Sequence, residues 1–131
     1  QQALAGVDVI KLTARGSHYL ITGIINDDVE TELMIDTGAS FTVINQTLLN
    51  SLNTPPNYLG TLQVNTANGV IEAQRYQLES FQIGQQRISN FEVLVIENHA
   101  GYGLLGMNFL ENFKFNINQQ VNELELTKNN F

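Results

Sequence analysis

Short strand-like segments separated by turn residues follow one another along almost the whole chain. These segments are rich in β-branched and apolar residues, several alternate apolar with polar side chains, and they span residues 7–13, 18–26, 29–36, 58–67, 70–83 and 87–97. Only QTLLNSL (46–52), with Asn45 as its cap, and MNFLENF (107–113) have the pattern of short helices. The sequence therefore predicts an all-β fold with one or two short helices.

Turn residues predict how these strands are connected. Asn26-Asp27-Asp28 predicts a hairpin turn between the second and third segments, and Asn68-Gly69 predicts a second hairpin. Asn-Gly favours a type I′ turn because that turn needs positive φ at both central residues. A turn at 83–86 and a closing hairpin made by KFNIN and NELELTK complete the pattern.

Length and composition limit what the chain can be. With 131 residues it is long enough for one domain with its own core but too short for two, so residues 1–131 are expected to form a single domain. The formal net charge is −7 and the six Lys and Arg residues are scattered, so nucleic acid is not an expected partner. The absence of cysteine excludes disulfides and thiolate metal sites. No apolar run is long enough to span a bilayer, so no membrane contact is expected within this chain, while an anchor upstream of it stays open.

One acidic residue interrupts the apolar pattern in LMIDTGASFTVI (33–44). Asp36 stands between two segments that both have the pattern of buried strands. A charge in such a place costs stability unless it is paired, neutralised or used in function. Asp36 therefore needs a partner, either elsewhere in the chain or in a second copy of it.

Three motifs in a fixed order resemble the retropepsin-like aspartic proteases, in particular the bacterial single-domain members. They are DTGAS (36–40), VNTANGVIEAQ (64–74) and LLGMNFL (104–110), and the resemblance covers roughly residues 17–127. In that family an Asp-Thr-Gly loop carries the catalytic aspartate, a hairpin acts as a flap over the substrate, and two apolar residues plus Gly precede the last helix. The resemblance implies a closed acid-protease barrel and an aspartic endopeptidase that cuts extended peptides with apolar residues beside the scissile bond.

The chemistry that this resemblance implies needs two aspartates. Two carboxylates that face each other across a water share one proton, so one can act as base and the other as acid without a metal or other cofactor. The chain has a single Asp-Thr-Gly, and none of Asp8, Asp27 and Asp28 is followed by Thr-Gly or Ser-Gly. Asp36 is therefore expected to face its own copy across a two-fold axis, which makes a homodimer necessary for activity.

The resemblance also assigns roles to individual residues. Asp36, Thr37 and Gly38 are expected to form the catalytic loop, with Thr37 joining the two loops across the axis and Gly38 allowing close backbone approach. The expected substrate-binding residues lie on this loop, on the flap and before the last helix: Ala39, Ser40, Thr66, Ala67, Asn68, Gly69, Leu104 and Leu105. The substrate would lie extended between flap and floor, like an added strand.

Three positions near the site depart from patterns seen in the family. Viral members often carry Asp where Ser40 stands and Arg where Met107 stands, and these form an ion pair near the dimer interface. Loss of both partners leaves no unpaired charge, but it predicts a weaker dimer. Family members with Ser in place of Ala39 can hydrogen-bond the ionised carboxylate. Ala39 therefore predicts activity at higher pH, from mildly acidic to near neutral.

Other interpretations of the same residues stay open. A catalytically silent module with this fold would use the cleft only to bind peptide, or would serve to dimerise, although the intact DTG favours the enzyme. A hydrolase that pairs Asp36 with Glu32 is a third hypothesis, against which the DTG context argues. His18 and His99 lack metal-ligand spacing, so no metal site is expected. In bacterial relatives an amino-terminal membrane anchor often precedes a protease domain that lies outside the cytoplasm. The resemblance therefore implies a location that is periplasmic, or membrane-anchored and facing the periplasm.

Overall fold

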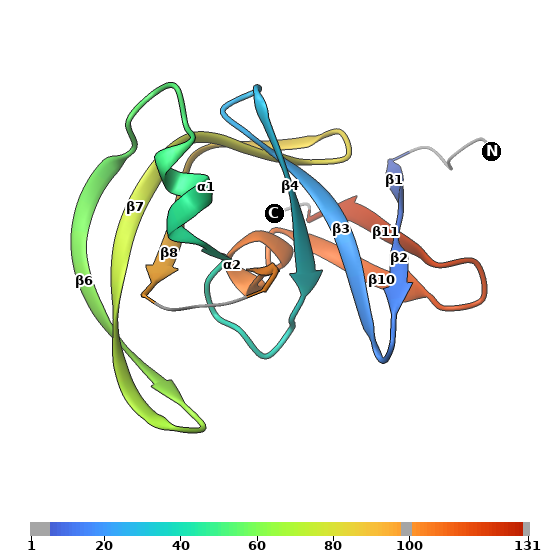
Figure 1. Ribbon diagram of the computed structural model, residues 1–131. Helices are drawn as coiled ribbons and strands as arrows, with labels where there is room; N and C mark the ends of the chain where they lie inside the picture. Colours follow the sequence, from blue (N-terminus) through green and yellow to red (C-terminus); the bar gives the residue numbers. More distant parts are fainter. Residues whose placement is uncertain (1–5, 98–100, 130–131) are drawn as a thin grey trace.

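The computed structural model describes residues 6–97 and 101–129, which form two β-sheets and two short helices (Figure 1). The strands are β1 (Val7–Lys11), β2 (Thr13–Arg15), β3 (His18–Ile25), β4 (Val29–Ile35), β5 (Val43–Ile44), β6 (Asn57–Thr66), β7 (Gly69–Ile83), β8 (Gln86–Ile96), β9 (Gly103–Leu105), β10 (Phe113–Asn118) and β11 (Glu123–Lys128). The helices are α1 (Gln46–Asn50) and α2 (Met107–Leu110). The predicted all-β fold class is confirmed.

The larger sheet is curved so that its strands meet again. Its strand order is β2-β3-β4-β9-β5-β8-β7-β6, and an additional antiparallel pairing joins β3 to β7, from Gly23↔Ile83 to Ile25↔Phe81. The run from β3 to β7 therefore forms a ring of paired strands. β6 lies outside this ring as an edge strand, and the long hairpin that it forms with β7 extends away from the body in Figure 1.

The smaller sheet joins the two ends of the described chain. Its order is β1-β11-β10, and it contains the predicted closing hairpin, β10–β11. Leu12 separates β1 from β2, and β2 pairs with β3 in the larger sheet. The Leu12 side chain is buried and the Leu12 N–H donates to the Asn122 carbonyl, and these two contacts fix the change of sheet. The prediction of one strand over residues 7–13 is therefore wrong, because alternation does not show where a chain changes its pairing partner.

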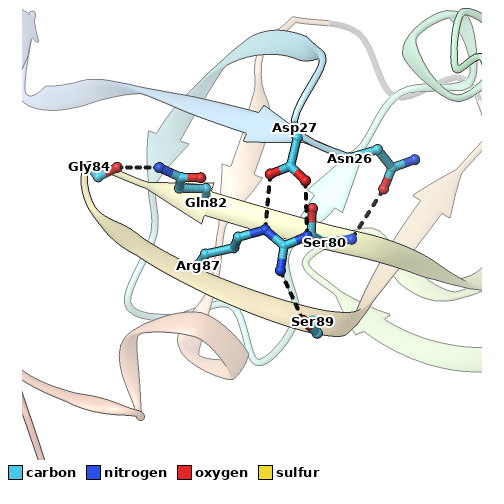
Figure 2. Close-up of polar contacts among 7 residues, drawn as sticks. All are labelled: Asn26, Asp27, Ser80, Gln82, Gly84, Arg87 and Ser89. Carbon is cyan, nitrogen blue, oxygen red and sulfur yellow. Dashed lines mark hydrogen bonds and ion pairs between the residues drawn. The ribbon is translucent and has the colours of Figure 1, made fainter.

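The turn between β3 and β4 is fixed by its own backbone and by β7 and β8. Asn26 and Asp27 have φ values of 55° and 59°, and a type I′ turn requires positive φ at both such residues. The Ser80 N–H donates to the Asn26 side-chain oxygen at 3.2 Å, and Arg87 Nε pairs with the Asp27 carboxylate at 2.9 Å. Figure 2 shows both contacts. Hydrogen bonds from Arg87 lower the pKa of the Asp27 carboxyl, so this ion pair stabilises the fold at neutral pH and ceases to do so in strong acid. The contribution is small because both side chains are largely exposed.

The second predicted hairpin forms, but its turn is of another kind. The pairing of β6 with β7 continues to Thr66↔Gly69, so the two loop residues are Ala67 and Asn68. Gly69 has a φ of 113°, whereas neither loop residue has positive φ. The prediction of a type I′ turn centred on Asn68-Gly69 is therefore wrong. The Thr66 hydroxyl stabilises the turn instead, because it donates to the Gly69 carbonyl at 2.8 Å and accepts from the Asn68 N–H at 3.2 Å.

Both predicted helices form, and both are shorter than predicted. Asn45 caps α1 as expected, since its side-chain oxygen accepts from the Leu48 N–H at 2.7 Å. α2 ends at Leu110 because Phe113 already begins β10. In the described part of the chain, no helix is both long enough and apolar enough to cross a membrane.

Phenylalanine side chains from four elements fill the centre of the core. Phe81 is fully buried and stacks on Phe91 with ring centres 4.8 Å apart, while the Phe109 ring of α2 meets Phe81 edge-on at 5.6 Å. Phe113 packs on Phe109 at 5.1 Å. The core therefore joins β7 and β8 to α2 and β10, and α2 is thereby fixed beneath the loop that follows β4.

Replacing Phe81 by alanine is expected to lower the free energy of unfolding by roughly 3–5 kcal/mol, because the change removes a stacked ring and leaves a cavity. Denaturant unfolding at one fixed protein concentration measures the loss. Val121→Ala serves as the control, since Val121 is 48% exposed and its truncation should change the free energy by less than about 1 kcal/mol. Similar losses for the two variants would contradict this description of the core.

Candidate active site

Asp36 lies directly after β4, where the chain leaves the sheet. Its N–H donates to the Leu105 carbonyl at 3.0 Å, which continues the parallel pairing of β4 with β9 by one residue. The side chain is half-buried, and its Oδ1 accepts from the Gly38 N–H at 2.9 Å. The Ala39 N–H donates to the Asp36 carbonyl at 3.1 Å. The carboxylate is therefore held by the tight turn that begins with it.

The rest of this loop rests on the segment that opens α2. The Met107 N–H donates to the Ala39 carbonyl at 2.8 Å, and the Asn108 N–H donates to the Ser40 carbonyl at 3.0 Å. A Cβ on Gly106 would lie 2.4 Å from the Phe41 carbonyl oxygen, so only glycine allows this approach. Ser40 and Met107, which lack the charges of the viral ion pair, thus belong to segments that backbone hydrogen bonds hold together.

A cavity of about 560 Å³ lies between the Asp36 loop and the β6–β7 hairpin. Its lining consists of Asp36, Gly38, Ala39, Ser40, Phe41 and Val43 from the loop and β5, of Leu62, Gln63, Val64, Asn65, Thr66 and Ile71 from the hairpin, and of Leu94, Ile96 and Leu104 from β8 and β9. Several of these side chains pack together as a small apolar cluster, separate from the main core. The cavity is therefore an apolar recess with a carboxylate at one side.

The structure brings together about half of the predicted site residues. Besides Asp36 and Gly38, the predicted residues that line the cavity are Ala39, Ser40, Thr66 and Leu104. Thr37 and the hairpin tip, Ala67, Asn68 and Gly69, are exposed and lie outside the lining. The prediction for Leu105 requires a correction, because its side chain is fully buried in the main core. Leu105 contacts the site only through its backbone carbonyl, which accepts the hydrogen bond from the Asp36 N–H.

Most of the apolar lining was not predicted from the sequence. Leu62 and Val64 share one face of β6 with Thr66, because side chains on a strand alternate between its two faces. Because Thr66 was predicted to line the site, the residues two and four positions before it, Val64 and Leu62, could have been predicted from this alternation. Phe41, in the loop, and Val43, at the start of β5, also line the cavity and were not predicted.

Asp36 supplies the only carboxylate among the described residues that line this cavity. Glu32 is exposed on β4 and is not part of the lining, so the geometry does not support a pair of Asp36 with Glu32 in one chain. Within residues 6–97 and 101–129, no group of three or more His, Asp or Glu side chains is placed to hold a metal ion. His18 is exposed on β3, and His99 lies outside the described residues.

The family model described as "gag-polyprotein putative aspartyl protease" matches residues 21–112, which is most of the chain. The chain belongs to this aspartyl protease family. The crystal structure of a retropepsin-like aspartic protease from Rickettsia conorii is 27% identical, with a TM-score of 0.70 over 94% of this chain and 91% of that chain. EIAV protease complexed with the inhibitor HBY-793 is 18% identical, with a TM-score of 0.63 over 76% of this chain and 90% of that chain, and this likeness concerns the fold alone. No curated protein sequence matches the chain.

Membership of the aspartyl protease family confirms the resemblance drawn from the three motifs. DTGAS, the hairpin sequence and LLGMNFL all fall within the matched residues 21–112. The retropepsin-like fold also explains why the motifs, far apart in sequence, meet in space: β9 carries Leu104 and Leu105 to the side of β4. The catalytic and binding roles of the individual residues stay predictions.

Proposed function

We propose that the protein is an aspartic endopeptidase whose active site forms between two copies of the chain. The observation that carries the proposal is the placement of Asp36, the only carboxylate among the described residues that line an apolar recess beside the β6–β7 hairpin. One carboxylate cannot act as both base and acid in the same step. A two-fold axis beside Asp36 supplies the second from the partner subunit.

The proposed reaction uses a water held between the two Asp36 carboxylates, which share one proton. The ionised carboxylate takes a proton from this water while the oxygen of the water bonds to the peptide carbonyl carbon. The protonated carboxyl donates its proton to the carbonyl oxygen, which gives a neutral tetrahedral diol. The carboxyl that took the proton from the water then donates it to the amide nitrogen, while the other carboxylate takes a proton from a hydroxyl of the diol. The C–N bond breaks and releases an acid and an amine, and the two carboxyls again share one proton. No covalent intermediate with the enzyme is needed.

The substrate class follows from the walls of the recess. Its apolar side chains, including Phe41, Leu62 and Leu104, favour an apolar side chain on the substrate near the scissile bond. The edge strand β6 and the loop backbone offer hydrogen-bonding groups to an extended peptide. We therefore propose extended peptides as substrates, with the β6–β7 hairpin acting as a flap.

A peptide-library digestion, run with protein shown to be dimeric, separates this proposal from a silent binding module. A statine-type peptide, which mimics the tetrahedral diol, should inhibit the cleavage because it resembles the transition state more than the substrate does. A dimeric protein that binds peptides and cleaves none of them would instead be the module.

Asp36→Asn should lower kcat by roughly a hundredfold or more, since the amide is nearly isosteric but can neither share the proton nor act as base. The fold should survive, and peptide cleavage together with thermal unfolding measures both effects. Asp28→Asn, the same change in the exposed β3–β4 turn, is the matched control and should retain activity. An Asp36→Asn protein with near wild-type kcat and an unchanged unfolding midpoint would eliminate the two-aspartate mechanism.

Ala39→Ser is expected to move the pH–activity profile to lower pH. The added hydroxyl can donate to the ionised carboxylate and so favours the ionised form, which lets the shared-proton state persist in more acidic solution. Cleavage of one peptide across pH 3 to 8 by both proteins measures the change. A shift to higher pH, or an unchanged profile, would contradict the role given to position 39.

Specific activity should fall on dilution, because each active site needs two chains and mass action dissociates the dimer. Two chains of formal charge −7 repel each other, so added salt should screen the repulsion and restore activity in dilute samples. Activity against dilution at low and high salt, with sedimentation in parallel, measures both effects. Constant specific activity in a sample that sediments as a monomer would show that one chain is sufficient.

A further inference from the structure

Thr42 ends the Asp36 loop with a hydroxyl that is out of contact with water. It is one of two fully buried polar side chains in the described part of the chain, the other being Ser80. Ser80 Oγ has no hydrogen-bond partner among the described residues, whereas the Thr42 hydroxyl both donates and accepts a hydrogen bond. Burying a polar group costs free energy unless the group is hydrogen-bonded. The hydrogen bonds of Thr42 therefore offset the cost of burying its hydroxyl, and their loss would leave polar groups buried without partners.

The Thr42 hydroxyl makes two hydrogen bonds, both to the segment that opens α2. It donates to Asn108 Oδ1 at 2.8 Å and accepts from the Gly106 N–H at 3.2 Å. The Thr42 N–H also donates to Asn108 Oδ1, at 2.8 Å. The other end of the same amide, Asn108 Nδ2, donates to the Glu92 carbonyl of β8 at 2.8 Å. A single amide side chain thus joins the loop, α2 and β8.

These contacts fix the second end of the loop on the same segment that fixes the first. Asp36 is bonded to Leu105, and Thr42 is bonded to Gly106 and Asn108. Neither Thr42 nor Asn108 lines the cavity, so neither is placed to contact a substrate there. Any effect of the two side chains on chemistry must therefore act through the geometry of the loop between them and Asp36.

We propose that Thr42 and Asn108 are positioning residues, which hold the Asp36 carboxylate in the orientation that peptide hydrolysis requires. This inference rests on the proposed aspartic protease function. Small displacements of a reacting group lower kcat strongly while substrate binding is little changed, so the network should control kcat more than KM.

The test compares removal of a buried hydroxyl that makes these hydrogen bonds, in Thr42, with removal of a buried hydroxyl that makes none, in Ser80. Thr42→Val keeps the shape and the backbone bonds of Thr42 but loses both hydroxyl bonds, and kcat should fall roughly tenfold to a hundredfold with KM changed less than about threefold. Thr42→Ser restores a hydroxyl and should keep kcat within about threefold of wild type. Ser80→Ala removes the other buried hydroxyl, which holds nothing, and should leave both constants unchanged.

Asn108→Asp provides a second test should Thr42→Val fold poorly. The carboxylate still accepts from Thr42, but when ionised it cannot donate to the Glu92 carbonyl. The loss of kcat relative to wild type should therefore shrink as the pH falls and the new carboxyl becomes protonated. A loss that is the same at every pH would overturn the part assigned to Asn108.

Amide hydrogen exchange tests the positioning without relying on activity. The Gly38 and Ala39 N–H groups both donate to atoms of Asp36, and Thr42→Val removes neither acceptor. Their exchange should nevertheless become roughly tenfold faster in Thr42→Val, and not in Ser80→Ala, because the loop as a whole loosens.

The outcomes distinguish this inference from the proposed function. A folded Thr42→Val with wild-type kcat, a rise in KM alone, or an equal loss of kcat in Ser80→Ala would overturn the positioning role. If the wild-type dimer cleaves no peptide, the proposed function fails and the exchange rates decide alone: unchanged rates at Gly38 and Ala39 overturn the inference, and faster rates support it.

Discussion

The insertion of β9 between β4 and β5 determines most of what surrounds Asp36. β9 is only three residues long, yet it pairs in parallel with β4 and in antiparallel fashion with β5. A Cβ on Gly103 would lie 2.5 Å from the Val43 carbonyl oxygen, so the close contact on this side requires glycine. Because β4 and β5 flank the Asp36 loop, the strand between them fixes where the loop starts and ends. The bond from the Asp36 N–H to Leu105 is a direct continuation of that pairing.

The hairpin that covers the site is held mainly at its base. β7 pairs with β8 from Ala73 to Ile83, and Arg75 of β7 forms an ion pair with Glu92 of β8 at 2.7 Å. The same Glu92 accepts from Asn108 through its backbone carbonyl. Towards the tip, β6 and β7 have only each other as partners, and the side chains there are exposed. The hairpin is therefore anchored next to the Asp36 loop and has the fewest pairing partners at its tip, which suits the flap role proposed for it.

The proposed chemistry places an unusual demand on an acidic chain. A single carboxylate in the recess has to approach a second one, although each chain already carries a formal charge of −7. Sharing a proton between the two carboxylates removes one of the two negative charges at the closest point of contact. Assembly and protonation are thus linked in the proposed enzyme, and both respond to pH and salt.

Local patterns in the sequence were enough to predict the all-β class, the order of the hairpins, the cap at Asn45 and the family. These features depend on local patterns: period-2 alternation, turn residues, and the motifs DTGAS and LLGMNFL. Tertiary structure alone decided the change of sheet at Leu12, the turn geometry near Gly69, the apolar lining from β6 and β8, and the burial of Leu105 and Thr42. Each of these features depends on which distant strand lies alongside, and neither propensity nor spacing along the chain contains that information.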